Sequence, residues 1–380
     1  MNPDFLVVGA GPFGLTVARQ LAEGGRRVLV IDKRCHIGGN AHSAIDPPTG
    51  IEVHPYGPHL FHTSDQQVWE FVSRFSQFTN YQHRVWTTHA GQVYPLPINL
   101  ATINQFYGSS YSPAQARAQM AQVALSIGDD GGQEGQPVTS IYPDLFEAFI
   151  RGYSTKQWGV DPALLPAATI KRLPLRFNYD SRYFSDPFQG LPVDGYHQLW
   201  QRLADHELID LELDCDFFDP AVAVAQRRVV GQLPVVYSGP LDRFFGYSLG
   251  ELAWRSVNWD WAHHQTGDYQ GCAVMNFADL DVPHTRVIEF RHFYPERDYP
   301  PDITVTATEF PGPTGPEDEP FYPVNGSADA ERLARYRQLA RELPDIHFGG
   351  RLGGYQYLDM DKAIANGLAL ADRLLAKPVH

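Results

Sequence analysis

The sequence is short of cysteine, of positive charge and of long apolar runs, and each shortage excludes a class of protein. Three scattered cysteines, at Cys35, Cys215 and Cys272, form neither a disulfide framework nor a CxxC pair, which is typical of a reducing cytoplasm. The formal net charge of −14 at pH 7 repels nucleic acid and anionic membrane surfaces, so we expect neither as a partner. No run reaches the roughly 18–20 unbroken apolar residues of a membrane-spanning helix, so we expect no membrane insertion.

The N-terminal segment has the pattern strand, glycine-rich turn, helix, strand, acidic residue. Residues 4–8 form an apolar run, the stretch GAGPFG follows it at once, and residues 15–23 have helical spacing of apolar residues. A second apolar run, residues 28–31, ends at Asp32, which is placed to accept hydrogen bonds from ribose hydroxyls. The glycines let a pyrophosphate approach the backbone at the helix N-terminus; they are Gly9, Gly11 and Gly14. The pattern predicts dinucleotide binding, with a tight turn in a nucleotide-free α/β domain as the alternative.

Two further features favour FAD over NAD as the dinucleotide. A glycine pair, Gly38-Gly39, stands six and seven residues after Asp32 and resembles the pair found in FAD-binding oxidases and reductases. Near the C-terminus, a short strand at residues 346–348, two glycines and a helix over 359–375 resemble the third FAD contact of those families. The N-terminus of such a helix stabilises negative charge on a reduced flavin by about 0.3–1 kcal/mol.

The middle of the chain predicts two more parts. Residues 100–127 are rich in helix formers, with a helix start at Ser112-Pro113, and residues 145–152 predict another helix. Three β-rich runs predict antiparallel strands, at residues 273–277, 287–291 and 304–308. We therefore predict an α/β fold with three domains: a discontinuous Rossmann-like FAD-binding domain (1–75, 190–240 and 330–380), a helical insert (97–160) and an antiparallel β-sheet substrate domain (76–96, 161–189 and 241–329).

Six motifs spread over nearly the whole chain resemble the bacterial type of the UDP-galactopyranose mutase family. They are HIGGNAHS (36–43), YGPHLFHT (56–63), GYSTKQWG (152–159), IKRLPLRFNYDSRYF (170–184), TRVIEFRHFYPERDYP (285–300) and FGGRLGGYQYLDM (348–360). The resemblance implies an isomerase that interconverts UDP-galactopyranose and UDP-galactofuranose and supplies galactofuranose for cell-surface glycans. It also implies a mobile lid near residues 161–173, and it is compatible with a homodimer.

The chemistry that this family implies uses reduced FAD as a nucleophile, with no net redox change. Flavin N5 attacks the anomeric carbon as UDP departs, and the covalent adduct opens to an iminium. The sugar then recloses through a different hydroxyl, and UDP returns. An electron donor, a reduced nicotinamide or another reductant, would have to reduce the flavin first.

The resemblance also implies a set of substrate-binding residues. Arg172 and Arg286 match the two arginines that hold the departing diphosphate, where a guanidinium fork binds phosphate oxygens bidentately. Four tyrosines match hydroxyl donors to the diphosphate: Tyr153, Tyr183, Tyr322 and Tyr357. Other matches contact the uridine end, the substrate or the sugar: Phe149, Trp158, Asn276, Ser154 (a threonine in much of the family) and Asp359. Ile150 stands where the family has a second aromatic beside Phe149, which leaves one aromatic face for the base.

The histidines His59 and His62 are spaced like metal ligands, but no cysteine or carboxylate completes a site, so we expect no metal. The resemblance instead places their loop against the flavin, with His62 near N5 as a catalytic residue, and gives Arg351 to the FAD pyrophosphate. The predicted cofactor-binding residues are Gly9, Gly11, Pro12, Phe13, Gly14, Asp32, Lys33, Gly38, Gly39, Asn40, His59, Leu60, Gly350, Arg351, Tyr357, Leu358, Asp359 and Met360.

Other functions are compatible with parts of the sequence. The FAD elements alone would fit an FAD-dependent oxidase or dehydrogenase that acts on a nucleotide sugar. A non-catalytic nucleotide-sugar binding module is a second alternative, although it would not need the loop of His59 and His62. A glycosidase is disfavoured because no pair of carboxylates has a spacing that suggests one acid and one nucleophile.

Overall fold

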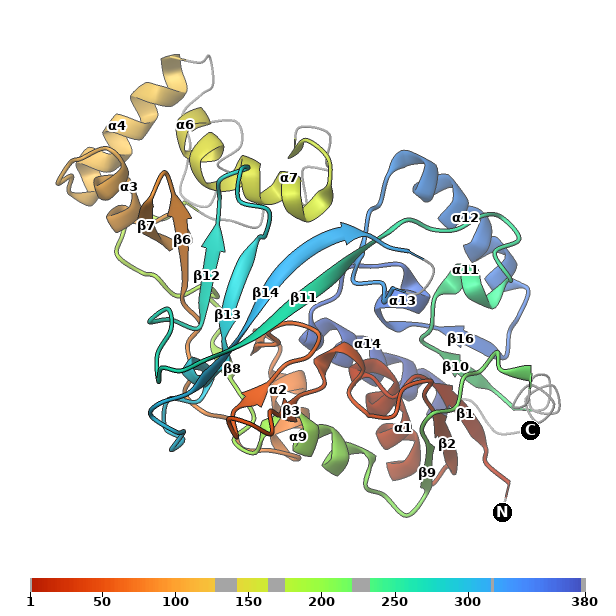
Figure 1. Ribbon diagram of the computed structural model, residues 1–380. Coiled ribbons are helices and arrows are strands. Elements are labelled where there is room, and N and C mark those ends of the chain that lie inside the picture. Colours follow the sequence, from red (N-terminus) through yellow and green to blue (C-terminus); the bar gives the residue numbers. More distant parts are fainter. Residues whose placement is uncertain (1, 127–141, 163–174, 221–232, 316–317, 377–380) are drawn as a thin grey trace.

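The chain folds around two sheets, with a group of helices at one end of the second sheet (Figure 1). The structure is a computed structural model that describes residues 2–126, 142–162, 175–220, 233–315 and 318–376. The α/β class predicted from the sequence is confirmed. Within these ranges, no helix combines the length and the apolar character that crossing a bilayer requires.

The first sheet has five strands in the order β16-β10-β1-β2-β9, and all its neighbouring pairs are parallel. Its strands come from distant parts of the chain: β1 (Phe5–Val8), β2 (Val28–Ile31), β9 (Ile209–Glu212), β10 (Val235–Tyr237) and β16 (Ile346–Phe348). The strands predicted at residues 4–8, 28–31 and 346–348 are confirmed. Continuous apolar runs suit this sheet because both of its faces are covered.

The helices of this part cover the two faces of the parallel sheet. One face packs against α1 (Pro12–Glu23), α9 (Gly195–Ala204) and α14 (Met360–Leu375), and α2 (Gln66–Ser73) lies against α14. The other face packs against residues 215–218, α11 (Leu241–Phe244) and Leu343, which follows α12 (Ser327–Arg341). A short helix, α13 (Gly350–Gly354), lies between β16 and α14 where the sequence predicted only glycines. Asp359 is the N-cap residue of α14, but its side chain makes no capping hydrogen bond.

The second sheet has seven strands in the order β15-β11-β14-β13-β12-β6-β7. Its strands are β6 (Val85–His89), β7 (Gln92–Leu96), β11 (Trp254–His264), β12 (Val274–Phe277), β13 (Arg286–Glu289), β14 (Thr304–Pro313) and β15 (Tyr322–Pro323). The three predicted strands correspond to β12, β13 and β14, which pair antiparallel as predicted, whereas β6 pairs with β12 in parallel. The sequence analysis also missed β11, in which polar residues interrupt the apolar pattern and pairing with β14 over ten residues decides the structure.

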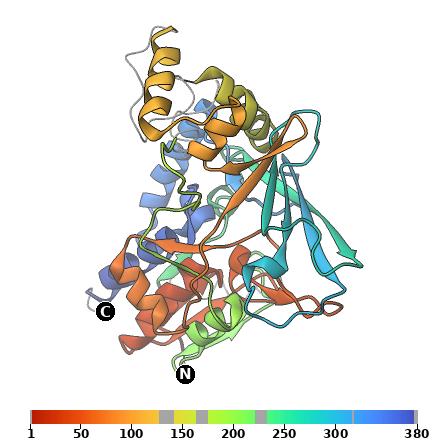
Figure 2. The same cartoon turned by 90° about the vertical axis from the view of Figure 1, so that its left-hand side faces the viewer.

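Among the described residues, helices form the end of the molecule that lies farthest from both termini (Figure 2). They are α3 (Leu100–Phe106), α4 (Pro113–Ser126), α6 (Pro143–Phe146) and α7 (Gly152–Trp158), with a π-helical turn over Glu147–Arg151. The helix start predicted at Ser112-Pro113 is confirmed: the Gln115 amide N–H donates to Ser112 Oγ at 3.4 Å, and the Ser112 amide N–H donates to Gln115 Oε1 at 2.9 Å. The acidic glycine-rich loop at residues 128–136 lies outside the described residues.

Two small antiparallel pairs connect the larger parts. Strand β5 (Phe61–Thr63) pairs with β8 (Phe188–Gly190), and β3 (Ala44–Ile45) pairs with β4 (Glu52–Val53). Single 3-10 turns lie at Gly39–Ala41 and Phe290–Phe293. The β5–β8 pair brings the YGPHLFHT segment beside the end of the IKRLPLRFNYDSRYF motif, although the two are more than 100 residues apart in the chain.

Candidate functional site

A cavity of about 880 Å³ lies at the carboxyl edge of the parallel sheet. Residues that follow each of the five strands line it: Gly9 after β1, Asp32 after β2, Cys215 after β9, Ser238 after β10 and Gly350 after β16. In open α/β sheets, ligands bind at this edge, where the strand order reverses. The parallel sheet thus gathers residues from almost the full length of the chain around one cavity.

The glycine turn after β1 is built for close backbone approach. A Cβ on Gly9, whose φ is +105°, would lie 2.1 Å from Ser238 Oγ, and a Cβ on Gly14 would lie 1.9 Å from the Gly9 carbonyl oxygen. The second glycine pair packs on this turn, because the Gly38 amide N–H donates to the Ala10 carbonyl at 2.8 Å. Gly11, the N-cap of α1, offers no side chain, so the N–H groups of the first helical turn are not capped by it.

Asp32 is buried and braces the same turn. Its Oδ2 accepts the Ala10 amide N–H at 2.7 Å, and its Oδ1 accepts the Arg34 amide N–H at 2.9 Å. Each carboxylate oxygen can accept more than one hydrogen bond, so both retain capacity toward the cavity that Asp32 lines. Contact with a ribose remains a prediction.

Most of the predicted cofactor-binding residues line this cavity. They are Gly9, Gly11, Pro12, Phe13, Gly14, Asp32, Lys33, Gly39, Asn40, His59, Gly350, Arg351, Leu358 and Met360. Four lie elsewhere: Gly38 faces the Trp200 ring, Leu60 packs against the core, Tyr357 stacks on Tyr322, and Asp359 precedes α14.

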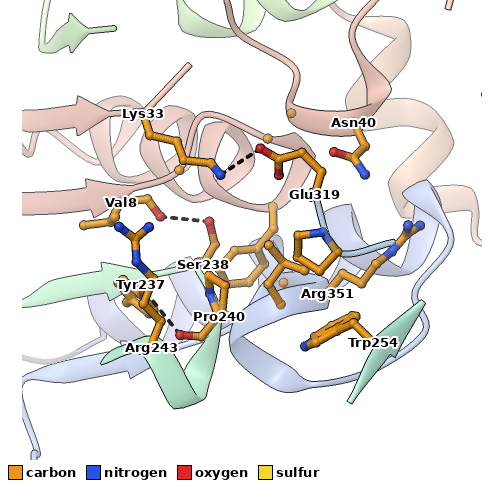
Figure 3. Close-up of a pocket in the computed structure, with 18 of the residues that line it drawn as sticks. Val8, Lys33, Asn40, Tyr237, Ser238, Pro240, Arg243, Trp254, Glu319 and Arg351 are labelled. Atoms are coloured by element: carbon orange, nitrogen blue, oxygen red, sulfur yellow. Dashed lines mark hydrogen bonds and ion pairs between the residues drawn. The ribbon is translucent and has the colours of Figure 1, made fainter. Parts of the chain in front are cut away.

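An acidic residue that the sequence analysis missed reaches into the cavity. Glu319 accepts Lys33 Nζ at 2.7 Å and an Arg34 guanidinium N–H at 2.9 Å, and Figure 3 shows Lys33 and Glu319 pointing toward each other. Burial raises the pKa of the Glu319 carboxyl, but Arg34 and Lys33 outweigh burial and hold the pKa below its ordinary value. No local pattern signals this contact, because 285 residues separate Arg34 from Glu319.

A second set of residues forms a row across one face of the seven-stranded sheet. Directly opposed residues in adjacent strands share a face, and the register aligns Tyr94, Thr87, Asn276, Arg286, Glu309 and Trp259 in that order. The row brings together Asn276 and Arg286, both predicted substrate residues.

Arg286 is held by a fully buried carboxylate. Glu309 Oε2 accepts from Arg286 Nε at 2.7 Å and lies 2.5 Å from its Nη2, while Glu309 Oε1 accepts the Thr285 hydroxyl at 2.7 Å. Burial acts to lower the pKa of Arg286, but Glu309 outweighs it and raises the pKa above its ordinary value. The guanidinium is therefore a fixed cation, and Glu309 occupies only part of its five N–H donors.

The predicted tyrosines gather around this cation. Burial raises the pKa of Tyr153 and of Tyr322 above their ordinary values, and Arg286 is close enough to both to oppose the shift. Tyr183 is also close enough to influence Tyr153. The Tyr322 ring stacks on that of Tyr357 at 5.7 Å and lies 6.1 Å from that of Trp158. Because Tyr153 and Tyr322 keep their protons at neutral pH, they can donate hydrogen bonds to an anion.

His59 connects the cavity to the row. It lines the cavity, and burial lowers its pKa to about 4, with the charges of Arg351 and Arg286 acting in the same direction. Its Nδ1 lies 2.7 Å from the Gly57 carbonyl, which fixes a neutral ring with the proton on Nδ1. A Cβ on Gly57 would lie 2.9 Å from the Trp259 ring and 3.8 Å from Arg286 Nη2. The loop thus touches both the cavity side and the sheet row.

His62 has a carboxylate partner that the sequence analysis missed. Its Nδ1 lies 2.7 Å from Asp186 Oδ2, and its ring stacks on that of Phe184 at 3.6 Å. Burial is the main cause that lowers the pKa of His83 to about 3. The charges of Arg286 and His62 act in the same direction, so His83 lies near both of them. His62 does not line the cavity, and His83 lies between it and Arg286 of the row.

The remaining predicted residues are placed differently or not described. Phe149 is 2% exposed, with its ring 4.9 Å from Tyr94 and 5.4 Å from Phe106, inside the core of the helical part. Ser154 is half-buried on α7. Arg172 and nearly all of the predicted lid at residues 161–173 lie outside the described residues.

One cluster in the described ranges has three candidate metal ligands within 4.8 Å of one another: Asp268, Glu289 and His292. None of the three lines the cavity. The Glu289 carboxylate already accepts backbone N–H groups from Tyr269 and Gln270, so hydrogen bonds account for its burial.

Comparisons with known proteins agree with this arrangement. Residues 148–357 match the model of the UDP-galactopyranose mutase family, and residues 7–75 match that of an NAD(P)-binding Rossmann-like domain. The chain is 44% identical over 376 residues to a probable UDP-galactopyranose mutase of Klebsiella pneumoniae (99% of this chain, 95% of the relative). It is 41% identical over 374 residues to a dTDP-fucopyranose mutase of Escherichia coli (96% and 97%). A crystal structure of reduced UDP-galactopyranose mutase shares the fold, with a TM-score of 0.71 at 16% identity over 99% of this chain and 94% of that one.

Proposed function

The chain belongs to the UDP-galactopyranose mutase family of isomerases, and we propose that it interconverts UDP-galactopyranose and UDP-galactofuranose with the help of reduced FAD. The observation that carries this proposal is the position of His59, which lies in the cofactor cavity and beside Arg286 at once. A dinucleotide in the cavity and a nucleotide sugar on the sheet row would therefore meet at this loop.

The residues of the cavity fit FAD. The turn around Gly9 and Gly14 has no room for side chains, which leaves the backbone open to a pyrophosphate, and Arg351 supplies a cation at the cavity wall. The N-terminus of α14 adjoins the lining residue Met360, where it would favour negative charge on a flavin ring. Reduced FAD would supply a nucleophilic nitrogen for the anomeric carbon, without net redox change.

Arg286 and the tyrosines would hold the diphosphate of the substrate. A fixed guanidinium with free N–H donors and neutral hydroxyl donors stabilise the charge that develops as a diphosphate departs. Because Glu309 and the sheet register fix Arg286 in advance, little reorganisation is needed when that charge appears. Trp158 and Asn276 flank this group and would contact the nucleoside.

The same proposal includes the physiological setting of the enzyme. We place it in the cytoplasm, where a reduced nicotinamide or another donor would reduce the flavin, and where the product would supply galactofuranose for cell-surface glycans. A homodimer is compatible with this proposal.

A second candidate substrate is a dTDP-fucose. The dTDP-fucopyranose mutase of Escherichia coli is almost as similar to this chain as the Klebsiella pneumoniae relative. Both candidates need the same cavity and the same diphosphate-binding residues, so substrate choice would depend on contacts to the base and the sugar.

The test is to measure conversion of UDP-galactofuranose to UDP-galactopyranose by chromatography, with and without dithionite, while the flavin absorbance is recorded. We expect turnover only with reduced flavin and no stoichiometric reoxidation. Reoxidation in step with product would indicate an oxidase or dehydrogenase instead, and binding without turnover would indicate a binding module. Turnover of dTDP-fucofuranose but not of the UDP-sugar would move the assignment to the second candidate.

A further inference from the structure

The ammonium group of Lys156 lies in a cage of backbone carbonyl groups. Lys156 Nζ donates to the carbonyl oxygens of Phe277, Asp279, Val282 and His284, at 2.8, 2.8, 3.0 and 2.9 Å. Phe277 is the last residue of β12, and the other three belong to the connection between β12 and β13. An ammonium has three N–H donors, so the four contacts use all of them and share one.

Lys156 belongs to α7, which is fixed to the sheet at two further points. A Cβ on Gly152 would lie 2.1 Å from the Ala278 carbonyl oxygen, so the helix and the β12–β13 connection are in close contact one turn before Lys156. At the other end, the Arg255 guanidinium donates to the carbonyls of Lys156 and Gln157 at 3.1 and 3.0 Å. Arg255 thus satisfies carbonyl groups that the helix end leaves without a partner.

The two elements that Lys156 joins carry different predicted substrate residues. Helix α7 carries Tyr153 and Trp158, whereas the connection it grips begins after Asn276 and ends before Arg286. The chain itself does not fix the position of α7 relative to Asn276 and Arg286, because over 110 residues separate the helix from them. Their relative position depends on how α7 packs on the sheet, through the β12–β13 connection, through Arg255 of β11 and through β14.

We propose that Lys156 is a positioning residue that fixes α7 to the β12–β13 connection and so sets the geometry between the nucleotide-binding side chains of the helix and Arg286. This inference rests on the proposed function of these side chains in substrate binding. A neutral amine has only two N–H donors and no charge, so it would hold the four carbonyls less firmly. A methionine of similar length would fill the space but donate nothing.

The cage predicts that nucleotide binding depends on pH. Burial lowers the pKa of Lys156 to about 8, and the nearby carboxylates of Asp279 and Asp281 oppose this. The other groups that face it are His284, whose pKa burial and Lys156 both lower, and Arg255, which bonds the Lys156 carbonyl. As the pH rises past about 8, the ammonium loses its proton, and the affinity for a nucleotide should fall.

The experiment uses the FAD-loaded protein and UDP as the probe, titrated by calorimetry from pH 6.5 to 9.5. We expect Lys156→Met to keep its flavin spectrum, to bind UDP at least tenfold more weakly than wild type at pH 7, and to lose the pH dependence. The matched control is Arg151→Met, which removes a cation from the preceding turn whose ion pairs with Glu147 and Asp161 are exposed. It should bind UDP within twofold of wild type.

A second variant covers the case in which Lys156→Met does not fold. Asp281→Asn removes a carboxylate that raises the pKa of Lys156, so the loss of UDP affinity should begin at lower pH than in wild type. Equal UDP affinity and an unchanged pH profile in Lys156→Met, or an identical profile in wild type and Asp281→Asn, would overturn the inference. If wild type itself does not bind UDP, the proposed function fails instead.

Discussion

At the scale of single residues, the buried carboxylate of Glu309 fixes the guanidinium of Arg286 in place. The carboxylate has no solvent exposure, and its two oxygens are taken by Arg286 and by the Thr285 hydroxyl. A buried pair of this kind contributes little net stability compared with apolar residues, but losing one partner is costly. The pair therefore fits the proposed role of Arg286 as a fixed cation for a diphosphate.

Arg286→Ala should lower both stability and turnover. The substitution leaves Glu309 buried without its cation, which should reduce the free energy of unfolding by about 3–5 kcal/mol. Loss of the diphosphate contact should lower turnover by roughly 10²–10³-fold. Urea unfolding and the mutase assay measure the two effects separately.

The double variant Arg286→Ala with Glu309→Gln separates these two roles. It removes the unpaired charge, so it should regain much of the lost stability while turnover stays low. Recovery of turnover together with stability would show that Arg286 acts only on the fold.

At the scale of elements, two glycines of the turn between β1 and α1 have different roles. Gly14 is needed for close packing, whereas we expect Gly11 to be needed for access of the ligand. Gly14→Ala should unfold the cofactor-free protein more easily, because its Cβ would lie 1.9 Å from the Gly9 carbonyl oxygen and 3.2 Å from Val7 Cγ1. Overpacking of this kind costs about 1–3 kcal/mol. The free energy of unfolding of the cofactor-free protein is the quantity to measure.

Gly11→Ala is the matched comparison. The nearest atom to its Cβ is 3.9 Å away, so the cofactor-free protein should keep its stability to within about 0.5 kcal/mol. The methyl group would nevertheless stand where the backbone meets a pyrophosphate, so the FAD content of the purified protein should drop. Full FAD occupancy in this variant would argue against the predicted path of the cofactor.

Helix α3 begins with a buried capping box that should matter for stability alone. Asn99 accepts the amide N–H groups of Ala101 and Thr102 at 2.9 and 3.3 Å. Asn99→Ala should cost about 1–2 kcal/mol, because those N–H groups lose their acceptor in a buried place. Asp65→Ala, at the less buried cap of α2, should cost less, and a thermal unfolding series compares the two.

At the scale of the whole molecule, histidines that burial or partial burial keeps neutral should make the protein sensitive to mild acid. Burial is the main cause that lowers the pKa of His42 and His59 to about 4 and that of His83 to about 3. In the unfolded chain each would titrate near 6.5. The unfolded state therefore binds more protons below pH 6.5, and stability should be complete above that value and fall as the pH drops toward 4.

Each histidine that gains a proton only on unfolding adds about 1.4 kcal/mol per pH unit to this slope. Urea unfolding of the cofactor-free protein at pH 7, 6 and 5 should show the decline. His83→Gln removes one such histidine, so the slope of the free energy of unfolding against pH should fall by an amount that corresponds to about one proton. A free energy of unfolding that stays constant between pH 6.5 and 5 would contradict the prediction.

The sequence by itself determined the features that depend on short stretches of chain. The glycine turn, the strand at residues 28–31 and the helix start at Ser112-Pro113 follow from local backbone preferences and apolar spacing, and the motifs carry the family resemblance. Strand β11 was not predicted, because its pairing with β14 stabilises it more than the β-propensity of its own residues does. The same holds for the parallel pairing of β6 with β12.

Only the tertiary structure decided which side chains meet. The partners of Arg286, Arg34, His62 and Lys156 are Glu309, Glu319, Asp186 and the carbonyls of the β12–β13 connection. Most of these partners lie more than 100 residues away, and a charged residue in a sequence does not reveal which opposite charge will be buried with it. Sheet register and helix packing choose the partner, because they fix which residues share a face and which are shielded from water.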